Sequence, residues 1–308
     1  MLLFRAVPEK RAMHRALLLM ATSAAFFGLM AFAAKRASAN LSGPQVAMIR
    51  FAVGLLPCIF VPRYRRSALK FKRVDLLLYR GLFGGFAVLL YFIAIEHTSV
   101  GVATLLNYTA PIFSGILSVI FIGEQISPRV LIPLPVALTG IFLVIHAHAA
   151  PGDLLGFGKW ELIGLSSGMC SGAAVTAMRA ARRGENSWSV YASFCGLGLL
   201  VTLPLAILTW KTPHGTQYVW LAATSLCAIV AQLLLTFSLR WVDAMTVGVI
   251  SQLAVVVSMA LGATFLDERI TLLAAIGSIL TVSGVVGVTY VTSLSKRTAD
   301  AVEVAPES

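Results

Sequence analysis

The most informative feature of this 308-residue sequence is how little charge it carries. Charged residues make up 12% of the chain, whereas soluble domains average about 25%. Acidic residues are the scarcest, with 13 Asp and Glu against 24 Lys and Arg, and the net charge is +11. Because a soluble fold of this length needs a polar surface, this composition, with 58% apolar residues, excludes a soluble globular protein. Lipid is the expected solvent for most of the chain.

Several motifs that would indicate other functions are also missing. The four cysteines lie inside apolar stretches and form no C-x-x-C pair, so we expect neither a zinc site nor a disulfide framework. The sequence contains no Walker-type phosphate loop, which excludes an ATP-driven pump built from this chain alone. Lys and Arg lie between apolar stretches rather than among aromatic residues, which argues against a nucleic-acid partner. No cofactor and no metal are expected.

Ten apolar stretches are each long enough to cross a bilayer, which takes about 20 residues in a helix. They lie near residues 15–34, 44–62, 74–96, 99–122, 128–148, 160–181, 187–209, 217–240, 243–265 and 271–292. The connections are short, the longest lies at the midpoint of the chain, and residues 294–308 are expected to form a disordered cytoplasmic tail. The sequence therefore predicts an all-α integral membrane protein with ten transmembrane helices.

The basic residues are distributed unevenly between the two sides of the membrane. If the N-terminus is cytoplasmic, 17 Lys and Arg lie in cytoplasmic segments and five lie in external ones. The positive-inside rule then places both termini in the cytoplasm, in a multi-pass protein of the plasma (inner) membrane. Arg50 and Arg80 are the only two basic residues left inside predicted spans.

The two halves of the chain repeat each other with an offset of 144 residues. The clearest match pairs residues 121–127 and 265–271, which read FIGEQIS and FLDERIT. Each half holds five predicted spans, an odd number, so the second half enters the membrane from the opposite side. We expect a first repeat over 1–149 and an inverted second repeat over 150–293. Inverted repeats of this kind are typical of secondary transporters.

Three motifs stand out in the repeats: NYTAP at 107–111, GEQI at 123–126 and LDERI at 266–270. With these motifs, residues from about 15 to 292 resemble the EamA-type members of the drug/metabolite transporter superfamily. The resemblance implies ten helices and export of small metabolites, with amino acids, including aromatic ones, among the substrates. The sequence departs from the repeat pattern at Ala254-Val255, which stands where the first repeat has Ala110-Pro111. We therefore expect the ninth span to lack the kink of the fourth.

Polar residues in the middle of predicted spans indicate where a substrate binds, because they are costly in lipid. The repeat offset pairs two such residues of the fourth span with two of the ninth. Spans eight and six add uncharged donors and acceptors. The predicted substrate-binding residues are Asn107, Tyr108, Ser251, Gln252, Gln232 and Ser167. The alternative is that these side chains form interhelical hydrogen bonds that hold the bundle together.

Aromatic residues and a proline add to this predicted site. Tyr79 and Phe83 in the third span are predicted to wall the pocket, with lipid-facing positions as the alternative. Pro111 lacks a backbone N–H, which predicts a kink that shapes or gates the site.

Charged residues near span ends suggest gates or anchors. Arg50 and Glu96, near the external ends of spans two and three, are predicted to pair as an external gate, with snorkelling of Arg50 as the alternative. Arg80 is expected to snorkel to the cytoplasmic surface. Glu124 and Glu268 are expected to be helix-end residues rather than proton carriers. Since no carboxylate lies at mid-span, passive transport and histidine-based coupling both remain open.

Together these features favour a secondary transporter, a uniporter or exporter, rather than an enzyme. The expected partners are membrane lipid and a small-molecule substrate, most of all a neutral or aromatic amino acid, and the protein is expected to be a monomer. Export of cationic drugs or nucleosides is the alternative on the same fold. A structural protein or lipid scramblase is a second alternative. An intramembrane serine protease, suggested by the G-x-S-x-G pattern at residues 164–168, lacks a mid-span histidine.

Overall fold

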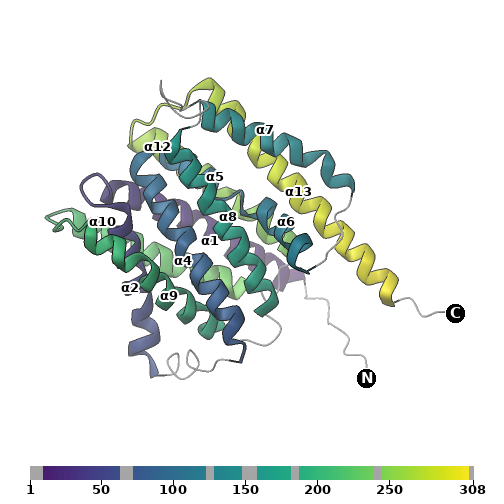
Figure 1. The fold of residues 1–308 in the computed structure, drawn as a ribbon, viewed down its shortest axis with the longest axis horizontal. Helices are drawn as coiled ribbons and strands as arrows, with labels where there is room; N and C mark the ends of the chain where they lie inside the picture. Colours follow the sequence, from purple (N-terminus) through teal and green to yellow (C-terminus); the bar gives the residue numbers. More distant parts are fainter. Residues whose placement is uncertain are drawn as a thin grey trace.

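The computed structural model of the protein describes residues 10–62, 72–122, 128–147, 158–181, 187–238 and 244–304 (Figure 1). These residues form helices and connecting turns, and none of them forms a strand. The helices are α1 (Lys10–Ala37), α2 (Gly43–Phe60), α4 (Val74–His97), α5 (Val100–Asn107), α6 (Ala110–Ile122), the short 3-10 helix η1 (Pro128–Leu131), α7 (Pro133–His146), α8 (Lys159–Ala181), α9 (Ser187–Leu208), α10 (Gln217–Ser238), α11 (Ala244–Ser251), α12 (Leu253–Phe265) and α13 (Leu272–Val304).

The described helices make ten crossings, which confirms the predicted all-α membrane fold. Within the described residues, nine helical segments are long and apolar enough to span a bilayer. The tenth, α8, has 23 residues but a more polar sequence, because glycines and serines line the face that it packs against α4, α5 and α6. Two crossings are interrupted: α5 and α6 form one, and α11 and α12 form the other.

The C-terminal region differs from the sequence-based expectation. The predicted disordered tail began at residue 294, yet α13 continues to Val304. Residues 294–304 contain no glycine or proline, so nothing in their sequence stops the helix where the apolar stretch ends. The last four residues lie outside the described part of the chain.

The helices of the two halves follow the 144-residue offset closely. Helices α1 and α8 end at Ala37 and Ala181, and α5 and α11 cover Val100–Asn107 and Ala244–Ser251. The two halves therefore fold with the same register, although few of their side chains are identical. Equivalent positions in the two halves can be compared residue by residue.

Both broken crossings are interrupted at the same place in the repeat. The break between α5 and α6 consists of Tyr108 and Thr109, and Pro111 lies in the first turn of α6. The break between α11 and α12 is Gln252. The expectation that the ninth span lacks a kink is therefore wrong. A tightened turn interrupts this helix without proline, since the Gln252 carbonyl accepts from the N–H of Val255, three residues on, at 3.0 Å.

Small residues let helices approach each other closely at matching places in the two halves. A Cβ on Gly172 of α8 would lie 2.9 Å from the Ala110 carbonyl oxygen, and one on Gly28 of α1 would lie 3.1 Å from the Ala254 carbonyl oxygen. The first helix of each half thus packs, through a glycine, against the broken crossing of the other half. Helices α7 and α13 run side by side along one edge of the bundle (Figure 1).

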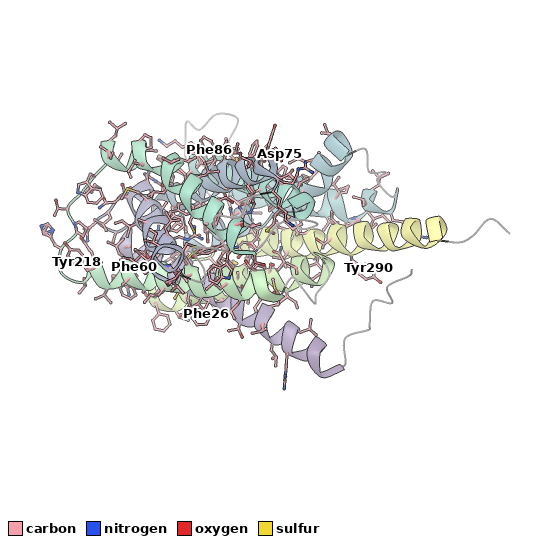
Figure 2. All side chains as sticks on the ribbon, turned by 90° about the horizontal axis from the view of Figure 1, so that it is seen from below. Phe26, Phe60, Asp75, Phe86, Tyr218 and Tyr290 are labelled. Atoms are coloured by element: carbon pink, nitrogen blue, oxygen red, sulfur yellow. The ribbon has the colours of Figure 1, made fainter. Side chains whose placement is uncertain are left out.

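The outer surface of the bundle is apolar, as expected for a protein surrounded by lipid. Phe60, Phe86, Tyr218 and Tyr290 project from the outside of the helices (Figure 2). Their exposed fractions range from 47% for Phe86 to 74% for Phe60. The outer surface therefore suits a lipid environment. Polar residues are costly in that environment, so those inside the bundle are the candidates for a functional site.

Candidate substrate site

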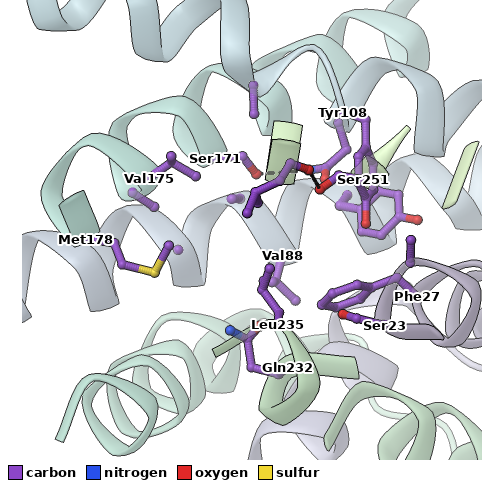
Figure 3. Close-up of a pocket in the computed structure, with 18 of the residues that line it drawn as sticks. Ser23, Phe27, Val88, Tyr108, Ser171, Val175, Met178, Gln232, Leu235 and Ser251 are labelled. Atoms are coloured by element: carbon purple, nitrogen blue, oxygen red, sulfur yellow. Dashed lines mark hydrogen bonds between the residues drawn. The ribbon is translucent and has the colours of Figure 1, made fainter. Parts of the chain in front are cut away.

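A cavity of about 250 Å³ lies between the two halves of the bundle (Figure 3). Helices α1, α2 and α4 and the α5–α6 break line it from the first half. Helices α8, α9, α10 and α13 and the α11–α12 break line it from the second. Of the residues predicted as a substrate site, kink or gate, it brings together Asn107, Tyr108, Ser251, Gln252, Gln232, Pro111 and Arg50.

The two breaks are joined to each other across the cavity wall. Gln252 donates a hydrogen bond from Nε2 to the backbone carbonyl of Tyr108 at 3.2 Å, so the equivalent positions of the two repeats touch. Gln252 has an exposed fraction of only 4%. Its amide nitrogen therefore makes a hydrogen bond between two helices, which is the alternative that the sequence analysis gave for these polar residues.

Asn107 is held by the neighbouring helix α8. Its Nδ2 donates to Ser167 Oγ at 3.0 Å and to Ser171 Oγ at 3.1 Å. Its Oδ1 accepts no hydrogen bond from the described residues, so the side chain presents an acceptor to the cavity. Asn107 thus both fastens α5 to α8 and offers a polar atom to a ligand.

Ser167 lies behind the cavity rather than in its lining. It is fully buried and donates to the Gly164 carbonyl at 2.6 Å while it accepts from Asn107. Ser171, which the sequence analysis did not select, lines the cavity instead (Figure 3). The signal was present in the sequence, because Ser171 lies one helical turn after Ser167 on the same face of α8.

Tyr79 and Phe83 do not line the cavity, and the prediction that they wall the pocket is wrong. Their rings stack on each other with centroids 5.7 Å apart, and Tyr79 is 61% exposed toward the surrounding lipid. The face of α4 that meets the cavity carries Arg80, Gly84, Ala87, Val88, Tyr91 and Phe92. The aromatic walls of the cavity are Phe27, Tyr91, Phe92, Tyr108 and Phe194.

The predicted external gate between Arg50 and Glu96 is not formed. Glu96 accepts a hydrogen bond from the backbone N–H of Gly43 at 2.7 Å, where its charge complements the N-terminus of α2. Arg50 lies two turns further along α2 and faces the cavity, with an exposed fraction of 6%. Its guanidinium contacts the rings of Phe51, Phe92 and Phe194, which also excludes snorkelling in this structure.

Arg80 points into the cavity as well, contrary to the expectation that it snorkels to the surface. Its exposed fraction is 8%, and its guanidinium carbon lies 4.2 Å from the centroid of the Phe194 ring. Neither arginine makes a hydrogen bond or ion pair with a described residue, and Nε and Nη1 of Arg50 and Nε of Arg80 are buried without a partner. Burying an unpaired charge costs several kcal/mol, and a desolvated cation–π contact offsets about 2 kcal/mol of that cost.

The end of the bundle away from the termini is closed by hydrogen bonds between helix ends. Lys35, in the last turn of α1, donates from Nζ to the carbonyls of Ile95 at 2.8 Å and Thr98 at 2.6 Å. Gln45 of α2 and the backbone of Lys211 exchange two hydrogen bonds, of 2.7 and 3.0 Å. These contacts join the ends of α1, α2 and α4 and the loop before α10.

Glu268 completes this closed end. Its carboxylate accepts from the backbone N–H of Val100 at 2.9 Å and so caps the N-terminus of α5. Burial raises the pKa of the Glu268 carboxyl, while the hydrogen bond from Val100 and the charge of Lys35 oppose that shift. The expectation that Glu268 is a helix-end residue is confirmed; Glu124 lies outside the described residues.

The cavity lies in the half of the bundle nearer the termini. Its lining includes Met178 near the end of α8, Leu235 near the end of α10, and Val247 in the first turn of α11. Because successive crossings alternate in direction, these helix ends all lie on the side of the two termini. The structure is thus closed at one end and hollow toward the other.

Comparisons with known proteins agree with this architecture. A family model described as the EamA-like transporter family matches the chain twice, over residues 14–146 and 158–290. The two matches begin one repeat offset apart. The pseudopaline exporter CntI of Pseudomonas aeruginosa (strain UCBPP-PA14) is 27% identical over 267 residues, which cover 86% of this chain and 92% of that protein.

Two further similarities extend the comparison. An uncharacterized transporter of Archaeoglobus fulgidus is 27% identical over 207 residues, covering 66% of this chain and 72% of that protein. A protein known from a crystal structure is 20% identical and has a TM-score of 0.61, covering 93% of this chain and 99% of that one. This last similarity shows a shared fold.

Proposed function

Because this chain belongs to the EamA-like transporter family, we propose that it exports small metabolites through the cavity between its two halves. The observation that supports this proposal most strongly is that both inverted repeats line a single cavity, which is closed at one end. Two halves of opposite orientation can exchange roles, so that the closed and open ends alternate. This exchange would carry a bound solute across the membrane by alternating access.

We assign the protein to the inner membrane with both termini in the cytoplasm. The distribution of Lys and Arg favours this orientation. In that orientation the cavity lies toward the cytoplasm, and the bonds of Lys35, Gln45 and Glu268 close the external end. Such a state loads substrate from the cytoplasm, which fits export.

The substrate we propose is an amino acid or a similarly small carboxylate. The cavity volume is just below the range of roughly 300–1,000 Å³ found for small-molecule sites, so a large drug does not fit without expansion. Aromatic rings such as Tyr91 and Phe92 supply apolar walls, and Asn107, Ser171 and Ser251 supply uncharged polar atoms. Cationic drugs are disfavoured, because two arginines and no acidic residue are present in the described lining.

Counterflow into proteoliposomes of the purified protein tests this proposal. Vesicles preloaded with an unlabelled solute are given the labelled solute outside, for a panel of amino acids, nucleosides and a cationic dye. We expect saturable counterflow of at least one amino acid and none of the dye. Repeating the assay with an imposed pH gradient separates uniport from proton coupling. If no solute moves in vesicles that contain folded protein, the transport proposal is wrong.

A further inference from the structure

We infer that Arg50 and Arg80 form a carboxylate-binding pair, and that the exported solute is a metabolite of net negative charge with two carboxylates. This inference rests on the proposed function and makes its substrate class specific. Both side chains are more than nine-tenths buried and both line the cavity. The inference starts from the fact that these two charges have no counter-ion in the described part of the protein.

The surroundings of the pair leave an anionic ligand as the missing partner. Buried charges in membrane proteins pair with one another or with backbone carbonyls, yet Nε and Nη1 of Arg50 and Nε of Arg80 are buried without a hydrogen-bond partner among the described residues. The lining contains no Asp or Glu among the described residues. A bound anion would supply both the missing charge and the missing hydrogen-bond acceptors.

The geometry suits carboxylates in particular. Arg50 and Arg80 contact the same ring, with guanidinium carbons 5.7 and 4.2 Å from the centroid of Phe194. The two guanidinium groups therefore lie near one ring, and their charges are close to each other. The guanidinium is a planar fork whose N–H groups match the two oxygens of a carboxylate. Two neighbouring guanidinium groups fit a solute with two carboxylates, because such a solute neutralises both positive charges.

The repeat shows that the fold itself does not require these arginines. The offset of 144 residues places Phe194 opposite Arg50 and Thr224 opposite Arg80. Thr224 is buried and bonds to its own helix, so the same backbone position accepts a small neutral residue. The two positive charges are therefore a property of the cavity rather than of the scaffold.

Glutamate and glutamine form a matched pair of probes, because they differ in charge and hardly in size. We expect wild-type protein in proteoliposomes to show glutamate counterflow at least about tenfold above glutamine counterflow, as expected for a loss of hydrogen bonds to a charged group. Arg50→Gln and Arg80→Gln should each lower glutamate counterflow about tenfold and change glutamine counterflow less than about twofold. Arg15→Gln, an exposed arginine on α1, is the control and should change neither.

The outcomes separate this inference from the proposed function. Counterflow of neutral amino acids with none of glutamate or succinate would leave the transporter intact and overturn the arginine pair. Equal loss of glutamate and glutamine counterflow in the arginine variants, with unchanged size-exclusion profiles, would also overturn it. If a variant does not fold, thermal stabilisation of wild-type protein by glutamate and succinate but not by glutamine decides the question without mutation. Absence of that stabilisation contradicts the inference.

Discussion

The two halves of this protein share a backbone and differ in chemistry. Several of their helix ends lie 144 residues apart, among them Ala37 and Ala181, and both halves break the same crossing at the same place. Yet the first half contributes both arginines of the cavity lining, while the equivalent positions of the second half hold Phe194, which also lines the cavity, and Thr224, which is not among the lining residues. If the arginines bind the solute as inferred above, the features common to both halves belong to the fold, and the charges found only in the first half belong to the binding site.

The largest effect should come from making the first half match the second at both positions. The double variant Arg50→Phe/Arg80→Thr removes both buried charges, so we expect glutamate counterflow to fall below about one hundredth of the wild-type value. Even a buried ion pair can often be replaced by well-packed apolar residues with no loss of stability or a gain of about 1–4 kcal/mol, and an unpaired buried charge is more costly still. The unfolding temperature in detergent should therefore stay the same or rise. A lower unfolding temperature together with wild-type flux would reverse this assignment.

A second comparison concerns the closed end. Lys35 bonds to three carbonyls at the end of α4, at 2.8, 3.3 and 2.6 Å, and the repeat offset places Arg179 at the equivalent position in the last turn of α8. In the orientation proposed above, we expect Lys35→Ala to open the closed, external end and Arg179→Ala to favour the conformation seen in this structure. The reason is that Lys35 closes one end of the bundle in this structure, and Arg179 would close the opposite end in the alternate conformation. Loss of Arg179 would therefore destabilise only the alternate conformation.

Labelling from outside measures this difference. In a protein whose native cysteines are replaced by serine, Met30→Cys places a thiol in the cavity lining. An impermeant maleimide should label it at least about fivefold faster with Lys35→Ala, since charged hydrogen bonds are each worth about 1.5–3 kcal/mol. Arg179→Ala should slow the labelling, and Lys159→Ala, near the external end of α8, serves as the control. Equal rates in the two test variants would contradict the symmetric gate.

A third comparison tests the polar residues at the two breaks. Asn107 makes two hydrogen bonds to α8, whereas Gln252 makes one long bond to Tyr108. We expect Asn107→Ala to lower the free energy of unfolding by about 1–2 kcal/mol and Gln252→Ala by about 0.5–1 kcal/mol. Flux should fall several-fold with Asn107→Ala, whose side chain also faces the cavity. Denaturant unfolding and counterflow measure the two effects, and a larger loss with Gln252→Ala would reverse the order.

The sequence predicted the fold well because the relevant signals are local. Apolar length indicated the crossings, and an odd number of crossings per repeat indicated the inversion. The repeat offset paired Asn107 with Ser251, and both line the cavity. Prediction from the sequence failed where the rotation of a helix about its axis decides which residues face the cavity. Tyr79 and Arg80 are adjacent in the sequence, yet Tyr79 points to the outside of the bundle and Arg80 points to the cavity. In an apolar span the two environments demand similar side chains, so hydrophobic pattern carries little information on facing.

The smallest effect should come from the proline that distinguishes the two breaks. Pro111 has a backbone position in the first turn of α6, where a missing N–H costs little. Since the α11–α12 crossing breaks at Gln252 without proline, we expect Pro111→Ala to retain the α5–α6 break and to change flux less than about twofold. Val255→Pro, the reciprocal change, removes the bond to the Gln252 carbonyl and should destabilise by about 1 kcal/mol. If Pro111→Ala instead abolishes flux, the break in the first half depends on proline, and the two halves differ in mechanics as well as in charge.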